Sequence, residues 1–195
     1  MNSDRRLWII DASYLFNARR AVAAGFQFDY LKLRNKVETF GALWRAYYLN
    51  STAHPAADAR DAFHSFLRSA PPRGPKLITK LYELRSVGVE GAYCEQCGSK
   101  VHVTCPNVAA HPLSNKQQKG VDVGMATLAL THRDHYDTLL LSSGDGDLLD
   151  TIEHLTELGK RFELVVFKNG VSTDLQARAD AIHWIDDFAD EVRRD

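Results

Sequence analysis

Two short apolar runs, each ended abruptly by polar turn residues, constrain the fold of this 195-residue chain more than any other feature. Residues 7–10 (Leu-Trp-Ile-Ile) stop at Asp11, and residues 138–141 (Thr-Leu-Leu-Leu) stop at Ser-Ser-Gly-Asp-Gly-Asp over 142–147. Continuous apolar runs of this length that end at turn residues are typical of strands buried on both faces, as in a parallel sheet. We therefore predict a mainly parallel sheet with helices on both sides.

Further strand and helix candidates alternate along the chain. Residues 162–167 are a third strand candidate, and the weaker ones are residues 44–49, 87–93 and 183–185. The helix candidates show apolar residues at helical spacing, a preceding Pro75 or a following Gly159; they are residues 29–40, 56–67, 76–87, 121–130 and 148–158. This alternation predicts an α/β fold, arranged as a three-layer α/β/α sandwich with a mainly parallel sheet.

Residues 93–118 interrupt the alternation with cysteines, prolines and polar residues that show no period. We expect this stretch to be an insertion in a single domain over residues 1–195, placed before a helix that opens at Lys119. The length suits one domain, at roughly 150 residues per domain. No apolar run approaches the about 18 residues of a membrane span, and the run at 7–10 is too short for a secretory signal. A cytoplasmic protein without a membrane partner is therefore expected.

The charges of the chain are distributed unevenly. Residues 1–120 carry 17 basic and 9 acidic side chains, and residues 121–195 carry 7 basic and 16 acidic ones. A basic half beside an acidic half suits a metal-dependent enzyme that acts on a polyanion, because lysine and arginine bind phosphates while carboxylates bind cations. Chance segregation of surface charge explains this feature, taken alone, equally well.

Four aspartates are expected at one edge of the sheet. Asp11 and the pair Asp145 and Asp147 follow predicted strands, and Asp122 lies in the first turn of the helix after the insertion. Residues at the carboxyl ends of parallel strands gather along one edge, where ligands bind. Crowded carboxylates repel one another unless cations neutralise them, and oxygen ligands without histidine or cysteine favour Mg²⁺ or Mn²⁺. The alternative is that each aspartate only caps a helix or interacts with a helix N-terminus.

Three sequence blocks resemble the signature blocks of NYN domains, in particular the LabA-like branch of the PIN-like nuclease superfamily. They are Trp-Ile-Ile-Asp-Ala-Ser at 8–13, Lys-Gly-Val-Asp-Val at 119–123 and Leu-Ser-Ser-Gly-Asp-Gly-Asp-Leu at 141–148. A looser block, Ser-Thr-Asp-Leu at 172–175 followed by Ala-Asp at 179–180, agrees with the ending of the family pattern. The blocks occur in family order and span nearly the whole chain.

The resemblance implies a PIN-like fold and a Mg²⁺- or Mn²⁺-dependent ribonuclease that hydrolyses phosphodiester bonds, with nucleic acid, RNA before DNA, as its partner. The catalytic and metal-binding residues carried over are Asp11, Asp122, Asp145 and Asp147. The family usually has Asn three residues after the first Asp, whereas this chain has Tyr14. A catalytically weak or inactive nucleic-acid-binding or regulatory module with the same fold is therefore the alternative function.

The candidate substrate-binding residues are Lys119, Ser143 and Tyr14. Lys119 lies three residues from Asp122 and suits a contact with a backbone phosphate, although an ordinary solvated lysine explains it equally well. Ser143 belongs to the block that carries Asp145. Tyr14 suits stacking on a base, although aromatic residues belong more often to a core.

The three cysteines follow the pattern C-x₂-C-x₄-H-x₂-C, formed by Cys94, Cys97, His102 and Cys105. A C-x₂-C turn closed by glycine presents two thiolates to one zinc ion, and a His–Cys pair completes the tetrahedron. We expect these four residues to hold one structural zinc that staples the insertion, with His111 as an alternative to His102. Three ordinary thiols in a loop are the competing explanation.

Overall fold

The computed structural model describes residues 4–52, 58–69 and 76–195. These residues form a seven-stranded sheet in the order β6-β3-β2-β1-β7-β8-β9 and a separate β4-β5 hairpin. Neighbouring strands of the large sheet are parallel, apart from the antiparallel pair β3 and β6. The strands are β1 (Arg6–Asp11), β2 (Leu43–Thr52), β3 (Ile78–Gly88), β4 (Gly91–Tyr93), β5 (Lys100–His102), β6 (Ser114–Gln118), β7 (Thr138–Ser142), β8 (Arg161–Val166) and β9 (Ala181–Trp184).

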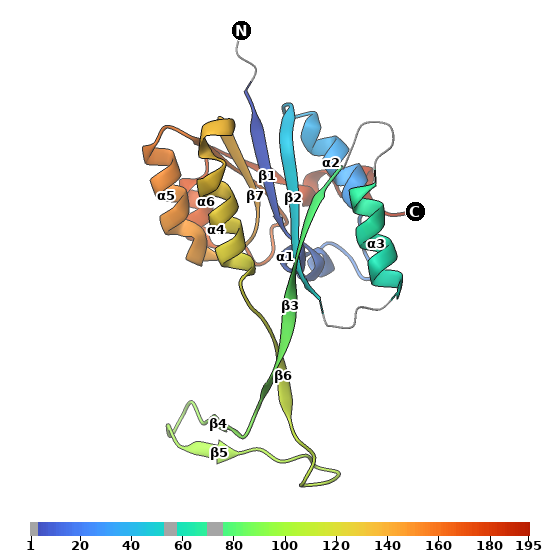
Figure 1. The fold of residues 1–195 in the computed structure, drawn as a ribbon, viewed down its shortest axis with the longest axis vertical. Helices are drawn as coiled ribbons and strands as arrows, with labels where there is room; N and C mark the ends of the chain where they lie inside the picture. The colour runs from blue at the N-terminus through green and yellow to red at the C-terminus, as the bar shows by residue number, and fades with distance from the viewer. Residues whose placement is uncertain (1–3, 53–57, 70–75) are drawn as a thin grey trace.

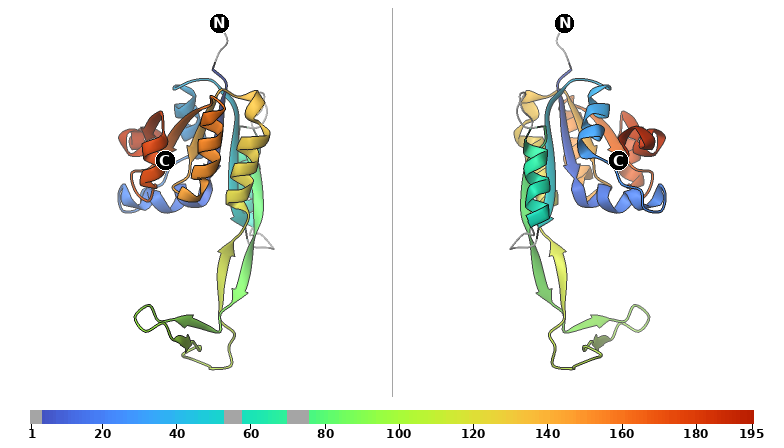
Figure 2. Two further views of the ribbon diagram at one scale, coloured as in Figure 1. Left: turned by 90° about the vertical axis from the view of Figure 1, so that its left-hand side faces the viewer. Right: turned by 90° about the vertical axis from the view of Figure 1, so that its right-hand side faces the viewer.

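Helices cover both faces of the sheet (Figure 1, Figure 2). One face carries α1 (Ala12–Ala18), α2 (Tyr30–Glu38), α3 (Asp58–Arg68) and α7 (Ala189–Val192), and the other carries α4 (Val121–Thr131), α5 (Leu149–Glu157) and α6 (Thr173–Arg178). Short 3₁₀ turns complete the connections: η1 (Arg19–Ala21), η2 (Arg133–His135), η3 (Gly146–Leu148) and η4 (Ile185–Phe188). No helix in the described part of the chain has the length and apolar character to cross a membrane.

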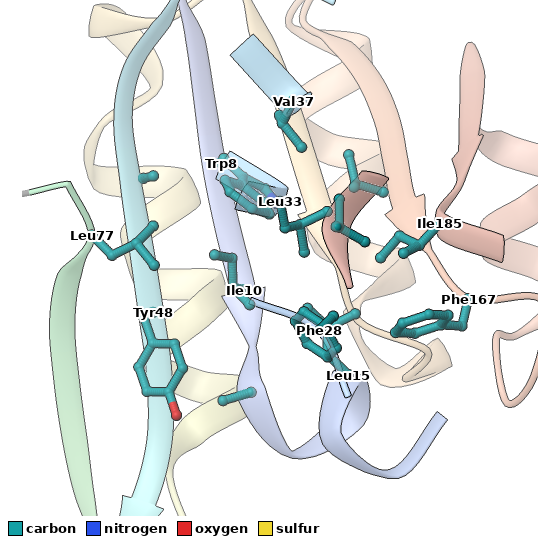
Figure 3. Packing of buried hydrophobic residues seen from close by; sticks show 14 of the residues in the cluster. Trp8, Ile10, Leu15, Phe28, Leu33, Val37, Tyr48, Leu77, Phe167 and Ile185 are labelled. Atoms are coloured by element: carbon teal, nitrogen blue, oxygen red, sulfur yellow. The ribbon is translucent and has the colours of Figure 1, made fainter. Parts of the chain in front are cut away.

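The central strand β1 supplies both hydrophobic cores. Trp8 and Ile10 pack into the cluster beneath α1 and α2, as Figure 3 shows, while Leu7 and Ile9 pack into the cluster beneath α4 and α5. Successive side chains of a strand point to opposite faces, so a continuous apolar run is required when both faces are buried. The predicted α/β fold with a mainly parallel sheet, consistent with a PIN-like sandwich, is therefore confirmed.

One helix prediction is wrong, and the reason is physical. Residues 76–87 do not form a helix, because 78–88 are the strand β3. This strand lies near the edge of the sheet, and most of its side chains are at least partly exposed. Its apolar residues are therefore free of strict alternation, and their spacing imitates a helix. Pro75, the predicted helix start, and the first two residues of the predicted helix at 56–67 lie outside the described residues.

The predicted insertion is a projecting arm. The outer half of β3 pairs with β6, from Leu84 opposite Gln118 to Gly88 opposite Ser114, and the β4-β5 hairpin lies at the far end (Figure 1, Figure 2). No strand is predicted at residues 114–118, because their polar sequence shows no strand pattern, yet they form β6. The helix after the arm begins at Val121, two residues later than expected.

A buried carboxylate connects three strands of the sheet, β1, β8 and β9. Glu163 in β8 is 2% exposed, and its oxygens lie 3.0 Å from Arg6 Nη1, 2.9 Å from His183 Nε2 and 3.2 Å from Arg161 Nη2. The hydrogen bond with His183, followed by the charges of Arg6 and the other partners, keeps the pKa of Glu163 below its usual value despite burial. These contacts stabilise the register of β1, β8 and β9.

We expect Glu163→Gln to lower the free energy of unfolding by about 3 kcal/mol at neutral pH, because it removes the buried carboxylate partner of Arg6 and leaves the more exposed Asp4 as its remaining partner. A lowered carboxyl pKa stabilises the fold above the unfolded pKa of about 4.5 and loses that effect as pH falls through the folded pKa. The difference from the native protein should therefore shrink below pH 4.5. Urea unfolding at several pH values measures it. Glu191→Gln, which alters an exposed pair with Lys36, is the control and should change stability by less than about 1 kcal/mol.

Candidate functional site

Asp11 is the last residue of β1 and at the same time the N-cap of α1. Its Oδ1 accepts hydrogen bonds from the backbone amides of Ser13 at 2.9 Å and Tyr14 at 3.1 Å. An aspartate in this position satisfies helix amides that otherwise have no partner, which explains why the strand turns into a helix here. The side chain is 8% exposed. Capping thus holds the carboxylate in a fixed position at the carboxyl edge of the sheet.

The loop after β7 places the second pair of acids at the same edge. Asp145 caps η3 by accepting a hydrogen bond from the amide of Asp147 at 3.0 Å. The loop passes so close to its neighbour that a Cβ on Gly144 would lie 1.9 Å from the carbonyl oxygen of Gly170. Glycine is therefore required at this position, which is why the block contains a Gly before its first acid.

Asp122 reaches the edge from the arm. The N-cap of α4 is Gly120, whose φ of +82° is in the region that glycine adopts most readily. This turn redirects the chain from β6 into α4 and leaves Asp122 exposed in the first helical turn. The helix then packs against η3, which carries Asp147.

The charges of these acids act on one another. The pKa of Asp11 is raised to about 6. Burial is the main cause, and the charges of Asp122 and Asp145 add to it, against the lowering effect of the two backbone hydrogen bonds. The pKa of Asp122 is also raised, first by desolvation and then by Asp145 and Asp147. The structure thus brings the four predicted acids to one edge, within electrostatic reach of one another.

The donor chemistry of this edge fits a hard divalent cation. Carboxylate oxygens are the ligands that Mg²⁺ and Mn²⁺ prefer, and a cation would relieve the repulsion that adds to the effect of burial on the two pKa values. Within residues 4–52, 58–69 and 76–195, however, no three His, Cys, Asp or Glu side chains stand close enough together to enclose one ion. The exposed Asp122 and Asp147 have room to change rotamer. The acids are thus gathered at the edge without forming a closed coordination shell.

Tyr14, the residue at which this chain departs from the family pattern, connects two parts of the edge. Its hydroxyl donates to the carbonyl oxygen of Phe167 at 2.8 Å and lies 3.3 Å from that of Asn169. A Cβ on Gly144 would also lie 2.7 Å from the tyrosine ring. Burial, followed by the charge of Asp186, raises the pKa of Tyr14 above its usual value, so the hydroxyl stays protonated. Tyr14 therefore holds α1 against the loops after β7 and β8.

The other two predicted substrate-binding residues differ in accessibility. Ser143 is fully buried, and its Oγ accepts a hydrogen bond from the amide of Asp145 at 3.2 Å. Its hydroxyl stabilises the turn and is not accessible to a substrate. Lys119 is exposed at the base of the arm, directly before Gly120. A phosphate contact by Lys119 stays a prediction.

Sequence reasoning missed a polar network that joins three strand ends. Ser13 Oγ lies 2.7 Å from Gln118 Oε1 and 3.4 Å from Asn50 Oδ1. Asn50 Nδ2 in turn donates to the hydroxyl of Tyr48 at 3.0 Å. Asn50 follows the run at 44–49, so placing that strand next to β1 would have brought it to the edge. The contact with Gln118 depends on the unpredicted strand β6.

The cysteines lie at the far end of the arm. In the turn from Cys94 to Cys97, the amide of Cys94 donates to the carbonyl of Ser99 and the amide of Gly98 donates to the carbonyl of Cys94. Hydrogen bonds, from Ser99 first and also from Cys94, lower the pKa of the Cys97 thiol. The Sγ of Cys105 lies 3.7 Å from Nδ1 of His111. His102 is an exposed β5 residue opposite Gly91. The nearest histidine partner of Cys105 is thus His111.

Comparison with known proteins adds a family context to this edge. The family model of the NYN domain matches residues 6–186. A protein of unknown function from Vibrio parahaemolyticus RIMD 2210633 has a similar structure, with 20% identity, a TM-score of 0.66 and coverage of 98% of this chain and 97% of its own. At that identity the likeness concerns the fold alone. A structure of Sir2 enzymes matches 98% of this chain and 91% of that chain at 10% identity and a TM-score of 0.44, too weak to support an argument. The search of curated proteins found no match.

We expect Asp11→Asn to stabilise the metal-free protein. A pKa raised from 3.8 to about 6 destabilises the fold above the folded pKa, and this penalty disappears as pH falls below the unfolded value. At about 1.4 kcal/mol per pKa unit, the variant should gain about 3 kcal/mol at pH 7.5 and about 1 kcal/mol at pH 4.5. Urea unfolding in EDTA measures both values.

The exposed Asp134 in η2 provides the matched control. Asp134→Asn should change the free energy of unfolding by less than about 0.5 kcal/mol at either pH. A loss of stability in Asp11→Asn at pH 7.5 would contradict this expectation, because it would show that the carboxylate serves mainly as a helix cap.

Proposed function

Because the chain belongs to the NYN domain family, a branch of the PIN-like nuclease superfamily, we propose that it is a Mg²⁺- or Mn²⁺-dependent nuclease that hydrolyses phosphodiester bonds, in RNA before DNA. One observation carries the proposal. The acids at the ends of β1 and β7 and in the first turn of α4 lie at one edge of the sheet, where the neighbouring charges add to the raised pKa values of Asp11 and Asp122. That shared negative potential attracts cations and has no role in stabilising the fold.

The four aspartates have different duties in this proposal. Asp11 is the fixed ligand, since two backbone amides hold one of its oxygens in place. Asp145 is also held, through its cap on η3, while the exposed Asp122 and Asp147 adjust around the cation. A bound Mg²⁺ or Mn²⁺ would supply charge that polarises the phosphodiester and activates water. Lys119, at the base of the arm, would contact a neighbouring backbone phosphate.

The packing of Tyr14 favours a second function, a catalytically weak or inactive nucleic-acid-binding module. The family usually has an asparagine at this position, and here the tyrosine hydroxyl is engaged by the carbonyls of Phe167 and Asn169. Tyr14 has no side-chain amide, and its hydroxyl is already bound, so it does not replace the amide of the usual asparagine. Nearby amide side chains are those of Asn17, one helical turn later, Asn50, near the end of β2, and Gln118, which contacts Ser13.

The purified protein should cleave labelled RNA with Mn²⁺ or Mg²⁺ and leave it intact in EDTA. Asp122→Asn should lower the cleavage rate by about 100-fold or more, because metal stabilisation of a transition state contributes several kcal/mol. The same variant should keep the native melting temperature. Labelled DNA of the same sequence tests the preference for RNA.

Asp134→Asn serves again as the control and should cleave at the native rate, because Asp134 lies away from the cluster in η2. Binding of RNA without cleavage under every metal condition would favour the inactive module. If Asp122→Asn lowers the melting temperature together with the activity, the role of Asp122 is to stabilise the fold.

We further propose that the arm carries one structural zinc, held by Cys94, Cys97, Cys105 and a histidine. The C-x₂-C turn, closed by Gly98 with a φ of +68°, supports two of these ligands. The distance between Cys105 and His111 favours His111 over His102 as the fourth ligand. Within the described residues the four side chains are not yet gathered around one point, so zinc binding would draw the arm tip together. Zinc would hold together an arm tip whose side chains are mostly exposed and bury no core of their own.

Metal analysis should find about one zinc per chain. His111→Ala and Cys94→Ser should lose the metal, whereas His102→Ala should keep it and serves as the matched control. Retention of zinc by His111→Ala with loss in His102→Ala would restore the original ligand set. Absence of zinc from the native protein, with all three thiols reacting freely, would overturn the site.

A further inference from the structure

A cavity of about 860 Å³ opens beside the acidic edge, on the face of the sheet that carries α1 and α3. Ala12 and Ser13 line it, and they directly follow Asp11 along the chain. Consecutive Cα atoms are about 3.8 Å apart, so the wall of the cavity begins within about 8 Å of the Asp11 backbone. The volume lies within the range of about 300–1,000 Å³ that is typical of sites for small organic groups.

Aromatic rings form much of the cavity wall. Phe16 from α1 and Phe66 from α3 are 50% and 51% exposed, although large aromatic side chains are usually covered. Behind them, Tyr30, Tyr48 and Phe63 pack against one another with ring centroids 5.1 to 6.2 Å apart. Tyr48 is at the lower end of the cluster in Figure 3. The inner wall is thus a rigid set of rings. Phe66 offers an exposed ring for stacking, and Phe16 is half exposed, with the guanidinium carbons of Arg19 and Arg20 4.2 and 5.6 Å from its ring centroid.

A buried positive charge lies in the same wall. Arg19 is 8% exposed, and its guanidinium carbon stands 4.2 Å from the centroid of the Phe16 ring. Its one hydrogen bond to a described residue is a long contact of 3.4 Å with the carbonyl of Phe26. No carboxylate in the described part of the chain forms an ion pair with it. Asp29 also lines the cavity, but its carboxylate caps α2. A buried guanidinium without a charged partner is costly unless a ligand supplies an anion.

Stacking surfaces and a phosphate-binding charge together match one chemical class. We propose that the cavity binds an unpaired nucleotide of a single-stranded nucleic acid, with its base between Phe16 and Phe66 and its phosphate at Arg19. This inference rests on the proposed nuclease function and specifies its substrate as single-stranded. A base inside a duplex is stacked and paired and does not enter such a cavity, whereas an unpaired base is free to stack on aromatic side chains.

The cavity and the acids then act on one strand. The nucleotide in the cavity places the adjoining phosphodiester near Asp11, because Ala12 and Ser13 connect the two sites. Residues that hold the substrate beside the reacting bond raise the rate by positioning, without taking part in bond cleavage. Phe16, Phe66 and Arg19 are positioning residues in this sense.

Binding in EDTA tests the proposal without cleavage. Fluorescence anisotropy with a labelled single-stranded RNA and with the duplex of the same sequence should show at least 10-fold tighter binding of the single strand. Phe66→Ala and Phe16→Ala should each weaken single-strand binding by about 5- to 100-fold, the range for loss of one stacked base, and Phe66→Trp should restore it. Arg19→Met should reduce the slope of log K against log salt by about 0.7, which corresponds to one lost phosphate contact.

Two controls keep the test specific. Leu158→Ala removes an equally exposed apolar side chain at the end of α5, far from the cavity, and should leave binding unchanged. Replacing single nucleotides by abasic residues should weaken binding of the native protein at one or two positions, and Phe66→Ala should no longer respond at those positions.

The possible outcomes distinguish the cavity assignment from the proposed nuclease function. Equal binding of single strand and duplex, with no effect of the phenylalanine variants, would overturn the cavity assignment even if the protein cleaves RNA. Full competition by a nucleoside monophosphate at the affinity of the strand would also overturn it, because the cavity would then be a site for a free nucleotide. Single-strand binding that depends on Phe66, without cleavage in any metal, would confirm the cavity and contradict the nuclease.

Discussion

Burial of β1 between two hydrophobic layers is the constraint on which the rest of the structure depends. Trp8 and Ile10 belong to one core and Leu7 and Ile9 to the other, so the strand has no polar face within its length. Charges occur only at the two ends of the strand: Arg6 at the start pairs with the buried Glu163, and Asp11 occupies the carboxyl end. Because β7 runs parallel to β1 in the neighbouring position, its own polar turn reaches the same edge. The site is thus a consequence of the way the core is built.

The edge combines opposite charges on the two sides of α1. Asp11 caps the helix and shares a negative potential with Asp122 and Asp145. Two residues beyond Tyr14, the same chain segment carries Phe16 and then Arg19 into the cavity wall. Neither charge is satisfied by the protein alone: the carboxylates repel one another, and the guanidinium has no acidic partner among the described residues. Both unfavourable charge arrangements fit a nucleic-acid substrate bound together with a metal ion: the cation would neutralise the carboxylates, and a phosphate would pair with the guanidinium.

Tyr14 shows how a departure from a family pattern acquires a structural role. Its hydroxyl binds the carbonyls that follow β8, and its ring fills the space next to Gly144. These contacts join α1 to the loop that carries Asp145, so the tyrosine fixes the relative positions of the two strand ends that hold the acids. The arm adds a third connection. Gln118, the last residue of β6, contacts Ser13 in α1.

The sequence by itself determined the central strands and several of the helices, and it placed Asp11, Asp145 and Asp147 directly after strands, because these features depend on local signals. A strand buried on both faces is a continuous apolar run, and an acid that ends it must lie at the edge. Tertiary structure decided what depends on exposure and on contacts distant in sequence. β3 and β6 pair in an exposed arm, where burial imposes no pattern, and the cavity forms from α1, α3 and the end of β2. The proximity of Cys105 and His111 and the packing of Tyr14 likewise follow from loop geometry, which spacing along the chain does not specify.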